Sequence, residues 1–186
     1  MRHIFRIFSS ALGICALLFF TSCAPAASPT DALAYQKNAA SVTLSGSVGE
    51  LEFSAIVTLS ACDNVKERDF TVEYTSPAAL RGVTVCCRAG VCEAKLGSVS
   101  TTGKAALALA RPAEAFTLDG EISKISAEGG ETLVTFANGE VAVVNGEPRR
   151  IALRCEDGVS LAVNIEKYIK DYPEEMASIF ISKVGR

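Results

Sequence analysis

The amino-acid sequence predicts a mainly β protein with a few helices: a single long, strongly curved antiparallel sheet with helices closing its open side. From Val42 onward the apolar residues recur mostly at every second position, the pattern of strands with one buried face. Glycine-containing turns separate the alternating stretches, as in antiparallel hairpins. About ten such strands in one sheet should curl rather than stay flat.

The first expected elements are a short helix and two strands. Residues 32–38 can form the helix, with Asp31 as its cap. Residues 51–59 and 70–75 alternate between apolar and polar side chains, so each is predicted to be a strand with one apolar face. The Ser-Pro-Ala-Ala-Leu segment, residues 76–80, is predicted to form one helical turn before the next strand.

Three cysteines lie in the stretch VTVCCRAGVCEAKLG, residues 83–97. A tight turn at Ala89-Gly90 would place Cys87 directly opposite Cys92 on the apolar face, where a disulfide fits. Cys86 then points to the other face, because successive residues of a strand alternate. We therefore predict a disulfide between Cys87 and Cys92.

The other cysteines of this region and beyond, Cys62, Cys86 and Cys155, leave alternatives open. A second disulfide among them and buried unpaired thiols both fit the sequence. A metal site is disfavoured, because the C-C-x4-C spacing matches no common zinc or iron–sulfur motif. A thiol redox site is disfavoured, because the chain has no C-x-x-C motif. We expect no metal and no cofactor.

The middle of the chain holds one ambiguous segment and one strong turn. Residues 101–114 contain AALALA, which fits a strand or a helix, and Pro112 is expected to break either. Asn138-Gly139 predicts a type I′ turn. A two-residue loop at this place pairs Phe136 with Val141 and Val134 with Val143, which puts four apolar residues on one face.

Further turns are expected at Gly129-Gly130 and Asn145-Gly146. At Glu156-Asp157-Gly158 a three-residue loop with left-handed Gly158 fits best, because it pairs Cys155 with Val159 and Leu153 with Leu161. Near the C-terminus, Asp171 and Glu174 resemble a capping box. A helix is predicted to follow, with Met176, Ile179, Phe180 and Val184 on one face.

The N-terminus predicts export and lipidation. Arg2, His3 and Arg6 precede the apolar run 11–20, which is the pattern of a signal peptide. Thr21-Ser22-Cys23 resembles the lipobox of bacterial lipoproteins, in which the cysteine is acylated; an ordinary signal peptide with an incidental cysteine is the alternative. We assign residues 1–22 to the signal peptide, 23–30 to a lipidated tether at Cys23, and 31–186 to a single domain. The expected localisation is extracytoplasmic, anchored by lipid to the bacterial cell membrane.

Composition narrows the function classes. The mature chain would carry 16 Lys and Arg against 21 Asp and Glu, with no basic cluster, which argues against binding to nucleic acid. The only histidine, His3, lies in the signal peptide. Histidine-based nucleophile activation and histidine-ligated zinc are therefore excluded from the mature protein, and we expect no catalysis and no catalytic residues.

Two stretches carry a resemblance to a known family: FTVEYTSPAALRGVTV, residues 70–85, and EISKISAEGGETLVTFANGEVAVVNGEPRRI, residues 121–151. With the expected anchor and N-terminal helix, residues 31–165 resemble the LolA-like lipoproteins and outer-membrane lipoprotein-sorting proteins. The resemblance implies an incomplete antiparallel barrel with helices plugging its open side, and a cavity for acyl chains. It brings no catalytic motif, and the cysteines of the domain are not part of the family pattern.

The expected function is therefore non-enzymatic binding of a lipid or acyl chain, or shielding of hydrophobic cargo such as a lipoprotein. No ligand-binding residue can be named from the sequence. One alternative is a structural or protein-interaction module with a filled core, and another is a thiol redox protein. A filled core would use the bulky inward residues of the strands: Phe53, Val57, Phe70, Val72, Phe136 and Val141.

Overall fold

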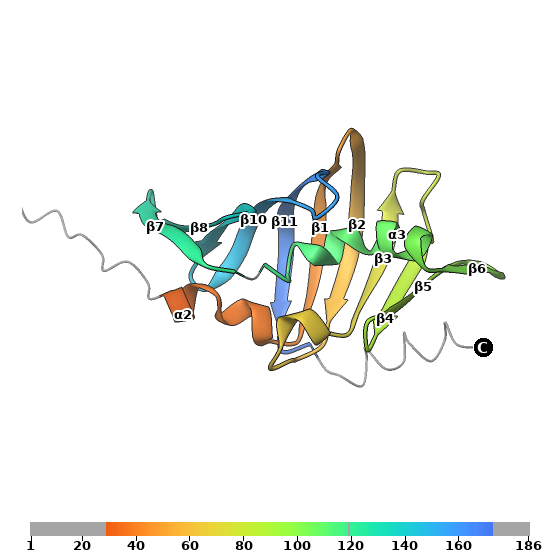
Figure 1. Ribbon diagram of the computed structural model, residues 1–186, viewed down its shortest axis with the longest axis horizontal. Coiled ribbons are helices and arrows are strands. Elements are labelled where there is room, and N and C mark those ends of the chain that lie inside the picture. Colours follow the sequence, from red (N-terminus) through yellow and green to blue (C-terminus); the bar gives the residue numbers. More distant parts are fainter. Residues whose placement is uncertain (1–28, 119, 173–186) are drawn as a thin grey trace, which may run out of the picture.

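The computed structural model describes residues 29–118 and 120–172, and the fold is built on one eleven-stranded antiparallel sheet (Figure 1). The elements in chain order are α2 (Pro29–Ala32), η1 (Ala34–Lys37), β1 (Ala40–Val48), β2 (Leu51–Leu59), η2 (Val65–Glu67), β3 (Phe70–Ser76), β4 (Thr84–Arg88), β5 (Val91–Leu96), β6 (Val99–Thr102), α3 (Lys104–Glu114), β7 (Ile122–Glu128), β8 (Glu131–Phe136), β9 (Gly139–Val144), β10 (Glu147–Arg154) and β11 (Ser160–Lys170). The predicted fold class, a mainly β protein with one long antiparallel sheet, is confirmed.

The strand order β6-β5-β4-β3-β2-β1-β11-β10-β9-β8-β7 describes two meanders joined by the pairing of β1 with β11. The sheet is not closed, because β6 and β7 are its two edges. The chain must therefore cross the whole sheet between β6 and β7, and α3 with residues 115–118 lies over one face on this path (Figure 1). We call that face the inner face.

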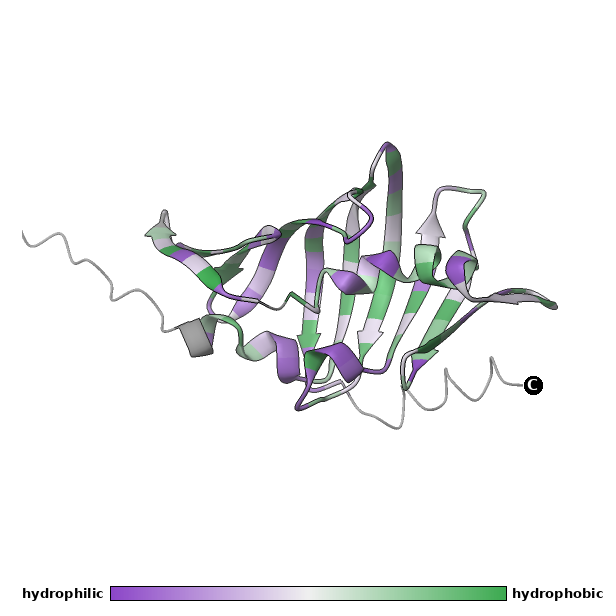
Figure 2. Ribbon diagram, viewed as in Figure 1, coloured by the Kyte–Doolittle hydropathy of each residue, from purple (hydrophilic) through white to green (hydrophobic). Residues whose placement is uncertain are grey.

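The inner face is apolar because the strands alternate as expected (Figure 2). In β2, Phe53, Ala55, Val57 and Leu59 are buried, whereas the residues between them are half-buried. Leu51 at the start of the strand is exposed. Most inward residues pack into one cluster with Tyr35 of η1 and Phe116, which are the largest fully buried side chains.

Two long-range hydrogen bonds hold the crossing segment on this face. The Tyr74 hydroxyl donates to the Leu109 carbonyl at 2.8 Å, which ties β3 to α3. The Gln36 amide donates to the Leu118 carbonyl at 2.8 Å, which ties η1 to the segment after α3. The crossing segment is thus fixed at both ends by buried or part-buried bonds.

Most of the predicted turns are present. The Ala89-Gly90, Gly129-Gly130 and Asn145-Gly146 turns all have positive φ at both residues. The three-residue loop after Cys155 is also confirmed: Gly158 has a φ of 84°, and Leu153 pairs with Leu161. The Cys155 amide donates to the Val159 carbonyl at 2.8 Å, which closes that loop.

The register predicted at Asn138-Gly139 is wrong by two residues. Val134 pairs with Val141, not Val143, and the connecting residues are Ala137 and Asn138. Neither Asn138 nor Gly139 has positive φ. Gly139 is instead required by the neighbouring strand, because a Cβ there would lie 2.8 Å from the Leu153 Cα and in contact with the Ala152 carbonyl oxygen. A shift of two residues keeps the same face buried, so the apolar pattern could not reveal the error.

The helical predictions need three corrections. Residues 101–114 form β6 and then α3, and Pro112 lies inside the last turn of α3 without ending it. The N-terminal helical segment consists of α2 and η1, so Asp31 lies within α2 and is not its cap. In the segment 76–80, Ser76 ends β3 and residues 77–80 form a hydrogen-bonded turn and no helix, with the Leu80 amide donating to the Pro77 carbonyl.

Several expectations lie outside the described residues: the signal peptide, Cys23, nearly all of the tether, and the C-terminal helix after Tyr172. Within residues 29–118 and 120–172, no helix is long and apolar enough to cross a membrane. In the same residues α3 covers part of the inner face, against β2 to β6 and β11. Closure of the whole open side by several helices stays a prediction.

Candidate ligand-binding pocket

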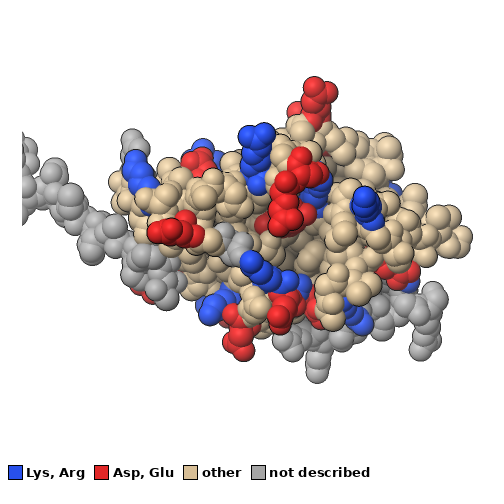
Figure 3. All heavy atoms as spheres, viewed as in Figure 1, with Lys and Arg blue, Asp and Glu red and all other residues tan. Residues whose placement is uncertain are grey.

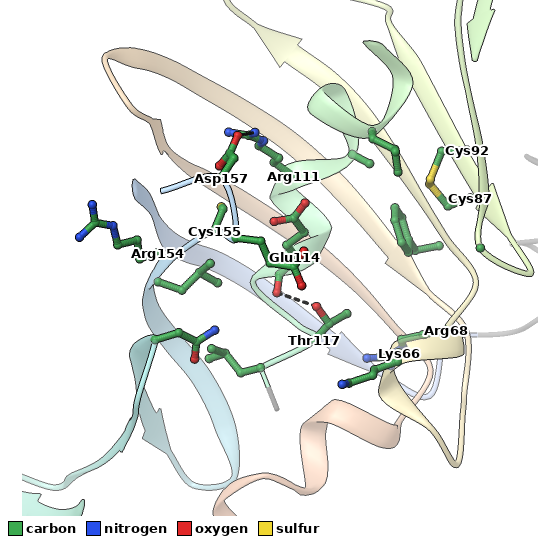
Figure 4. A pocket seen from close by; sticks show the side chains of 18 residues that line it. Lys66, Arg68, Cys87, Cys92, Arg111, Glu114, Thr117, Arg154, Cys155 and Asp157 are labelled. Carbon is green, nitrogen blue, oxygen red and sulfur yellow. Dashed lines mark hydrogen bonds and ion pairs between the residues drawn. A yellow bond between two sulfur atoms is a disulfide. The ribbon is translucent and has the colours of Figure 1, made fainter. Parts of the chain in front are cut away.

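A pocket of about 520 Å³ lies between the inner face of the sheet, the C-terminal half of α3 and η2 (Figure 4). Its lining comes from distant parts of the chain, which the crossing segment brings together. The lining residues are Lys66, Arg68, Phe70, Cys87, Gly90, Cys92, Leu107, Ala110, Arg111, Glu114, Thr117, Leu118, Asn138, Leu153, Arg154, Cys155, Glu156 and Asp157. This volume is within the range of about 300–1,000 Å³ that is typical of ligand pockets.

One wall of the pocket is apolar. Phe70 of β3 and the Cys87–Cys92 disulfide between β4 and β5 form its floor on the sheet side. Leu107 and Ala110 of α3 lie above them. Leu107 is half exposed, so part of its apolar surface is available to a ligand. The disulfide is the predicted one, and the register that places Cys87 opposite Cys92 is confirmed.

The η2 end of the pocket is basic. Arg68 lines it and is only 4% exposed. Its Nε donates to the Ser60 carbonyl at 2.7 Å and its Nη2 donates to the Asn38 carbonyl, whereas the buried Nη1 has no hydrogen-bond partner. Burial lowers the pKa of Arg68, because it disfavours the charged guanidinium.

The opposite end, where α3 meets the loop between β10 and β11, holds a cluster of ionisable groups. Arg111 forms an ion pair with Asp157, and this pair joins α3 to the loop (Figure 4). The Val159 amide donates to the Asp157 carboxylate at 3.1 Å and, together with Arg111, lowers the pKa of Asp157. On the surface, charged side chains of both signs gather around the middle of this face (Figure 3).

Glu114 and Cys155 point toward each other inside this cluster (Figure 4). Burial raises the pKa of Glu114, although a hydrogen bond with the Cys155 thiol and the nearby Arg111 oppose the change. Burial and the hydrogen bond with Glu114 raise the pKa of Cys155 to about 11. Burial also raises the pKa of Cys86. A raised pKa keeps both thiols protonated at neutral pH, which makes them poor nucleophiles.

The structure therefore brings some of the predicted residues to the pocket and leaves others apart. Cys87, Cys92 and Cys155 line it, whereas Cys62 and Cys86 are unpaired thiols elsewhere. Cys23 lies outside the described residues. No group of three or more His, Cys, Asp or Glu residues in residues 29–118 and 120–172 could hold a metal ion.

Sequence reasoning missed Arg68, Arg111 and Glu114. In the sequence, these three residues are spaced like ordinary charged residues of a protein surface. Arg68 follows a short polar loop, and its burial depends on carbonyls from Ser60 and from distant Asn38. Only the folded chain shows that these three side chains meet one pocket.

No protein-family model matches the chain, and no curated protein matches it. Among solved structures the chain is similar to an uncharacterized conserved protein from Thermus thermophilus, with 13% identity over 75% of this chain and 83% of the other, at a TM-score of 0.44. It is also similar to a LolA superfamily protein from Nitrosomonas europaea, with 11% identity over 78% and 93% of the two chains and a TM-score of 0.37.

A third similar structure is the MucA/MucB complex of Pseudomonas aeruginosa, with 14% identity over 76% of this chain and 54% of the other, at a TM-score of 0.41. This chain thus spans about half the length of that one. The likeness to a LolA superfamily protein is low in both identity and TM-score. At such identities the assignment of function rests on the pocket itself.

Proposed function

We propose that this protein is a lipid-anchored extracytoplasmic lipoprotein that binds a lipid or the acyl chain of a lipoprotein, without catalysing a reaction on it. The observation that carries the proposal is the pocket of about 520 Å³ beneath α3, which has an apolar wall and a basic end. An amphiphile offers the matching pair of features, a hydrocarbon chain and a polar headgroup.

The apolar wall provides the driving force for binding. Phe70, the Cys87–Cys92 disulfide, Leu107 and Ala110 line one continuous pocket with Leu118 and Leu153. Burying an acyl chain against such a surface removes apolar area from water on both sides, at about 25 cal/mol per Å². The rest of the inner face is filled by Tyr35, Phe116 and the strand residues, so the ligand is expected to occupy this one region.

The proposal also includes helices that close the open side of the sheet around the ligand. Within the described residues α3 already lies over part of the inner face. The Arg111–Asp157 ion pair joins it to the loop after β10, at the rim of the pocket. Opening of this contact would widen the entrance without disturbing the sheet.

The chemistry of the pocket supports binding rather than catalysis. The raised pKa of Cys155 leaves little thiolate at neutral pH. Glu114 has no histidine beside it, because the only histidine of the chain is His3. The same thiol chemistry weighs against a redox role, the third function that the sequence left open.

Native mass spectrometry of the full-length protein after gentle extraction tests the proposal, together with titration of a neutral fluorescent acyl probe. The wild type should carry or take up a lipid. Leu107→Trp, which fills the pocket from α3, should weaken probe binding, whereas Ala105→Trp on the exposed side of the same helix should not. A wild type that carries no lipid and binds no probe would overturn the proposal.

One observation favours a second candidate function, a protein-interaction module. The edge strand β6 is exposed along its whole length; its first residue, Val99, is 71% exposed, and Leu96 of the neighbouring strand β5 is 50% exposed. An exposed edge strand can pair with an extended segment of another chain. If this is the function, Val99→Lys should abolish the interaction in vivo while lipid uptake stays unchanged.

A further inference from the structure

Within residues 29–118 and 120–172, Arg68 is a buried cation that forms no ion pair. Its side chain is 96% removed from solvent, since only 4% is exposed. Its two hydrogen-bond acceptors are the neutral carbonyls of Ser60 and Asn38, and its buried Nη1 has none in the described part of the chain. A buried charge is costly unless an opposite charge or a full set of hydrogen bonds compensates it. Among the described residues, the guanidinium thus has an unused donor and no compensating charge.

In the part of the chain that the structure describes, the groups whose charges shift the pKa of Arg68 include no carboxylate. They are the Cys62 thiol and the hydroxyls of Tyr35 and Tyr168. Tyr35 and Tyr168 both have raised pKa values through burial, to the extent that Tyr168 titrates at about 12. The two tyrosine hydroxyls are therefore neutral at physiological pH and do not balance the charge of Arg68.

The other cations of the pocket differ from Arg68. Arg111 is already paired with Asp157, and Arg154 is exposed to water. The described lining contains four basic and three acidic side chains, although the whole chain has a net charge of −3. The pocket is therefore locally positive on an acidic protein, which favours an anion inside it.

We propose that Arg68 binds the anionic headgroup, a carboxylate or a phosphate, of the amphiphile whose chain occupies the pocket. This inference rests on the proposed function and names the ligand class. Carboxylate and phosphate oxygens both accept charge-assisted hydrogen bonds from a guanidinium. Either one would give Nη1 a partner and balance the buried charge.

The geometry also predicts how the ligand lies. Arg68 and Lys66 extend from the η2 region at one end of the pocket, and the disulfide and α3 lie farther along it (Figure 4). With its headgroup at Arg68, the ligand has Phe70, Cys87–Cys92 and Leu107 along its chain. Because Nη1 is shielded from solvent, the headgroup reaches it by a small movement of η2, whose residues Lys66 and Glu67 are exposed.

Competition experiments on the full-length protein test this inference. A neutral naphthylamine probe is displaced by dodecanoate, by dodecyl phosphate and by dodecanol, which have the same alkyl chain and differ in the headgroup. The two anions should compete at concentrations about tenfold lower than dodecanol, because a hydrogen bond to a charged group is stronger than one to a neutral group. Inorganic phosphate alone should displace none of the probe.

Two variants assign the preference to Arg68. Arg68→Gln should remove the preference for the anions, so that dodecanoate, dodecyl phosphate and dodecanol compete at similar concentrations. The matched control is Arg111→Gln, which removes the same charge from the same pocket but from a cation already paired with Asp157; it should keep most of the preference. Circular dichroism on both variants checks that the fold is intact.

The outcomes separate this inference from the function on which it rests. If no competitor displaces the probe, the proposed function fails. If dodecanol competes as well as the two anions in the wild type, the acyl pocket stands and the role of Arg68 is overturned, whether or not the Arg68→Gln variant folds. Equal binding of inorganic phosphate and dodecyl phosphate would also overturn it, because the anion site would then be independent of the acyl pocket.

Discussion

At the scale of single residues, Glu114 determines how the pocket responds to pH. Its carboxyl faces Arg111 on its own helix, and Cys155, Glu156 and Asp157 on the neighbouring loop. Burial raises its pKa above the ordinary value of 4.5. A raised carboxyl pKa gives stability that is fully present below 4.5 and is lost as the pH rises through the folded-state pKa.

We therefore expect Glu114→Gln to remove this loss. Relative to the wild type, the variant should gain free energy of unfolding as the pH is raised from about 4 to 7, measured by urea denaturation. It should also bind dodecanoate more tightly at neutral pH, because one negative charge leaves the pocket. Glu156→Gln, at the exposed rim of the same pocket, is the matched control and should change the stability less. An identical pH profile for wild type and Glu114→Gln would contradict the prediction.

Gly139 is needed because of a close approach between strands, not because of the turn that the sequence predicts. The Asn-Gly pair is typical of a type I′ turn, but here glycine is needed because β10 passes so close that a Cβ would lie 2.8 Å from the Leu153 Cα. Gly139→Ala should therefore lower the free energy of unfolding by about 1–3 kcal/mol, as other overpacked sites do. Thermal unfolding measures this. Trimming the Leu153 side chain should not rescue the variant, because the clash is with backbone atoms.

The parity of the strands was enough to predict which cysteines face each other, but not the binding site. Cys87 and Cys92 follow from one local turn and the two-residue period of strands. Arg68 and Glu114 acquire their roles from contacts with residues far away in the chain or with a neighbouring loop. No local pattern encodes such contacts, and so the sequence could name no ligand-binding residue.

At the scale of elements, the β4–β5 hairpin offers a direct test of its disulfide. The bond joins residues five positions apart, so the loop that it closes is short. Chain entropy then predicts a loss of about 2 kcal/mol in the free energy of unfolding for the Cys87→Ser/Cys92→Ser variant. Denaturation of wild type and variant, with and without reductant, measures it. Cys86→Ser, which changes the adjacent free thiol, should have a much smaller effect, and an equal effect would contradict the assignment.

Helix α3 was ambiguous in sequence because its apolar residues fit two periods. The structure resolves this by packing: Ala106, Ala110 and Ala113 are buried against the sheet, a helical spacing. Pro112 is tolerated because it lies near the C-terminal end of α3, where only one helical hydrogen bond is lost. Whether a six-residue alanine and leucine run becomes strand or helix thus depends on the surface that it meets.

The Arg111–Asp157 ion pair should control how firmly the C-terminal end of α3 is held. Asp157 has a pKa below its ordinary value of 3.8, so the contribution of the pair is present above that pH and is lost as the pH falls through the folded-state pKa. Asp157→Asn should speed amide hydrogen exchange in residues 107–114 and accelerate ligand release. Glu156→Gln on the same loop should do neither. Unchanged exchange in α3 would show that the pair does not hold the helix.

At the scale of the whole molecule, one pairing determines the shape. Several hairpins of the two meanders could be predicted from their turns, although the register of β8 with β9 was wrong. The pairing of β1 with β11 instead joins residues such as Ala40 and Lys170. Alternation says which face of a strand is buried, not which distant strand is its neighbour. The sequence therefore predicted one curved sheet, but not that its middle is closed by the first and last strands.

The proposed anchor at Cys23 and the residues that line the pocket lie in separate parts of the sequence. We expect Cys23→Ala to abolish acylation and to shift the protein from the membrane fraction to the soluble fraction, because membrane attachment is proposed to depend on lipid at this one residue. The fold and the affinity for dodecanoate should stay unchanged, since the pocket is built from residues 66–157. Fractionation and intact-mass measurement test the first part, and probe displacement tests the second. Membrane attachment that survives Cys23→Ala would contradict the proposed anchor, whereas loss of ligand binding would show that the anchor and the pocket are not independent.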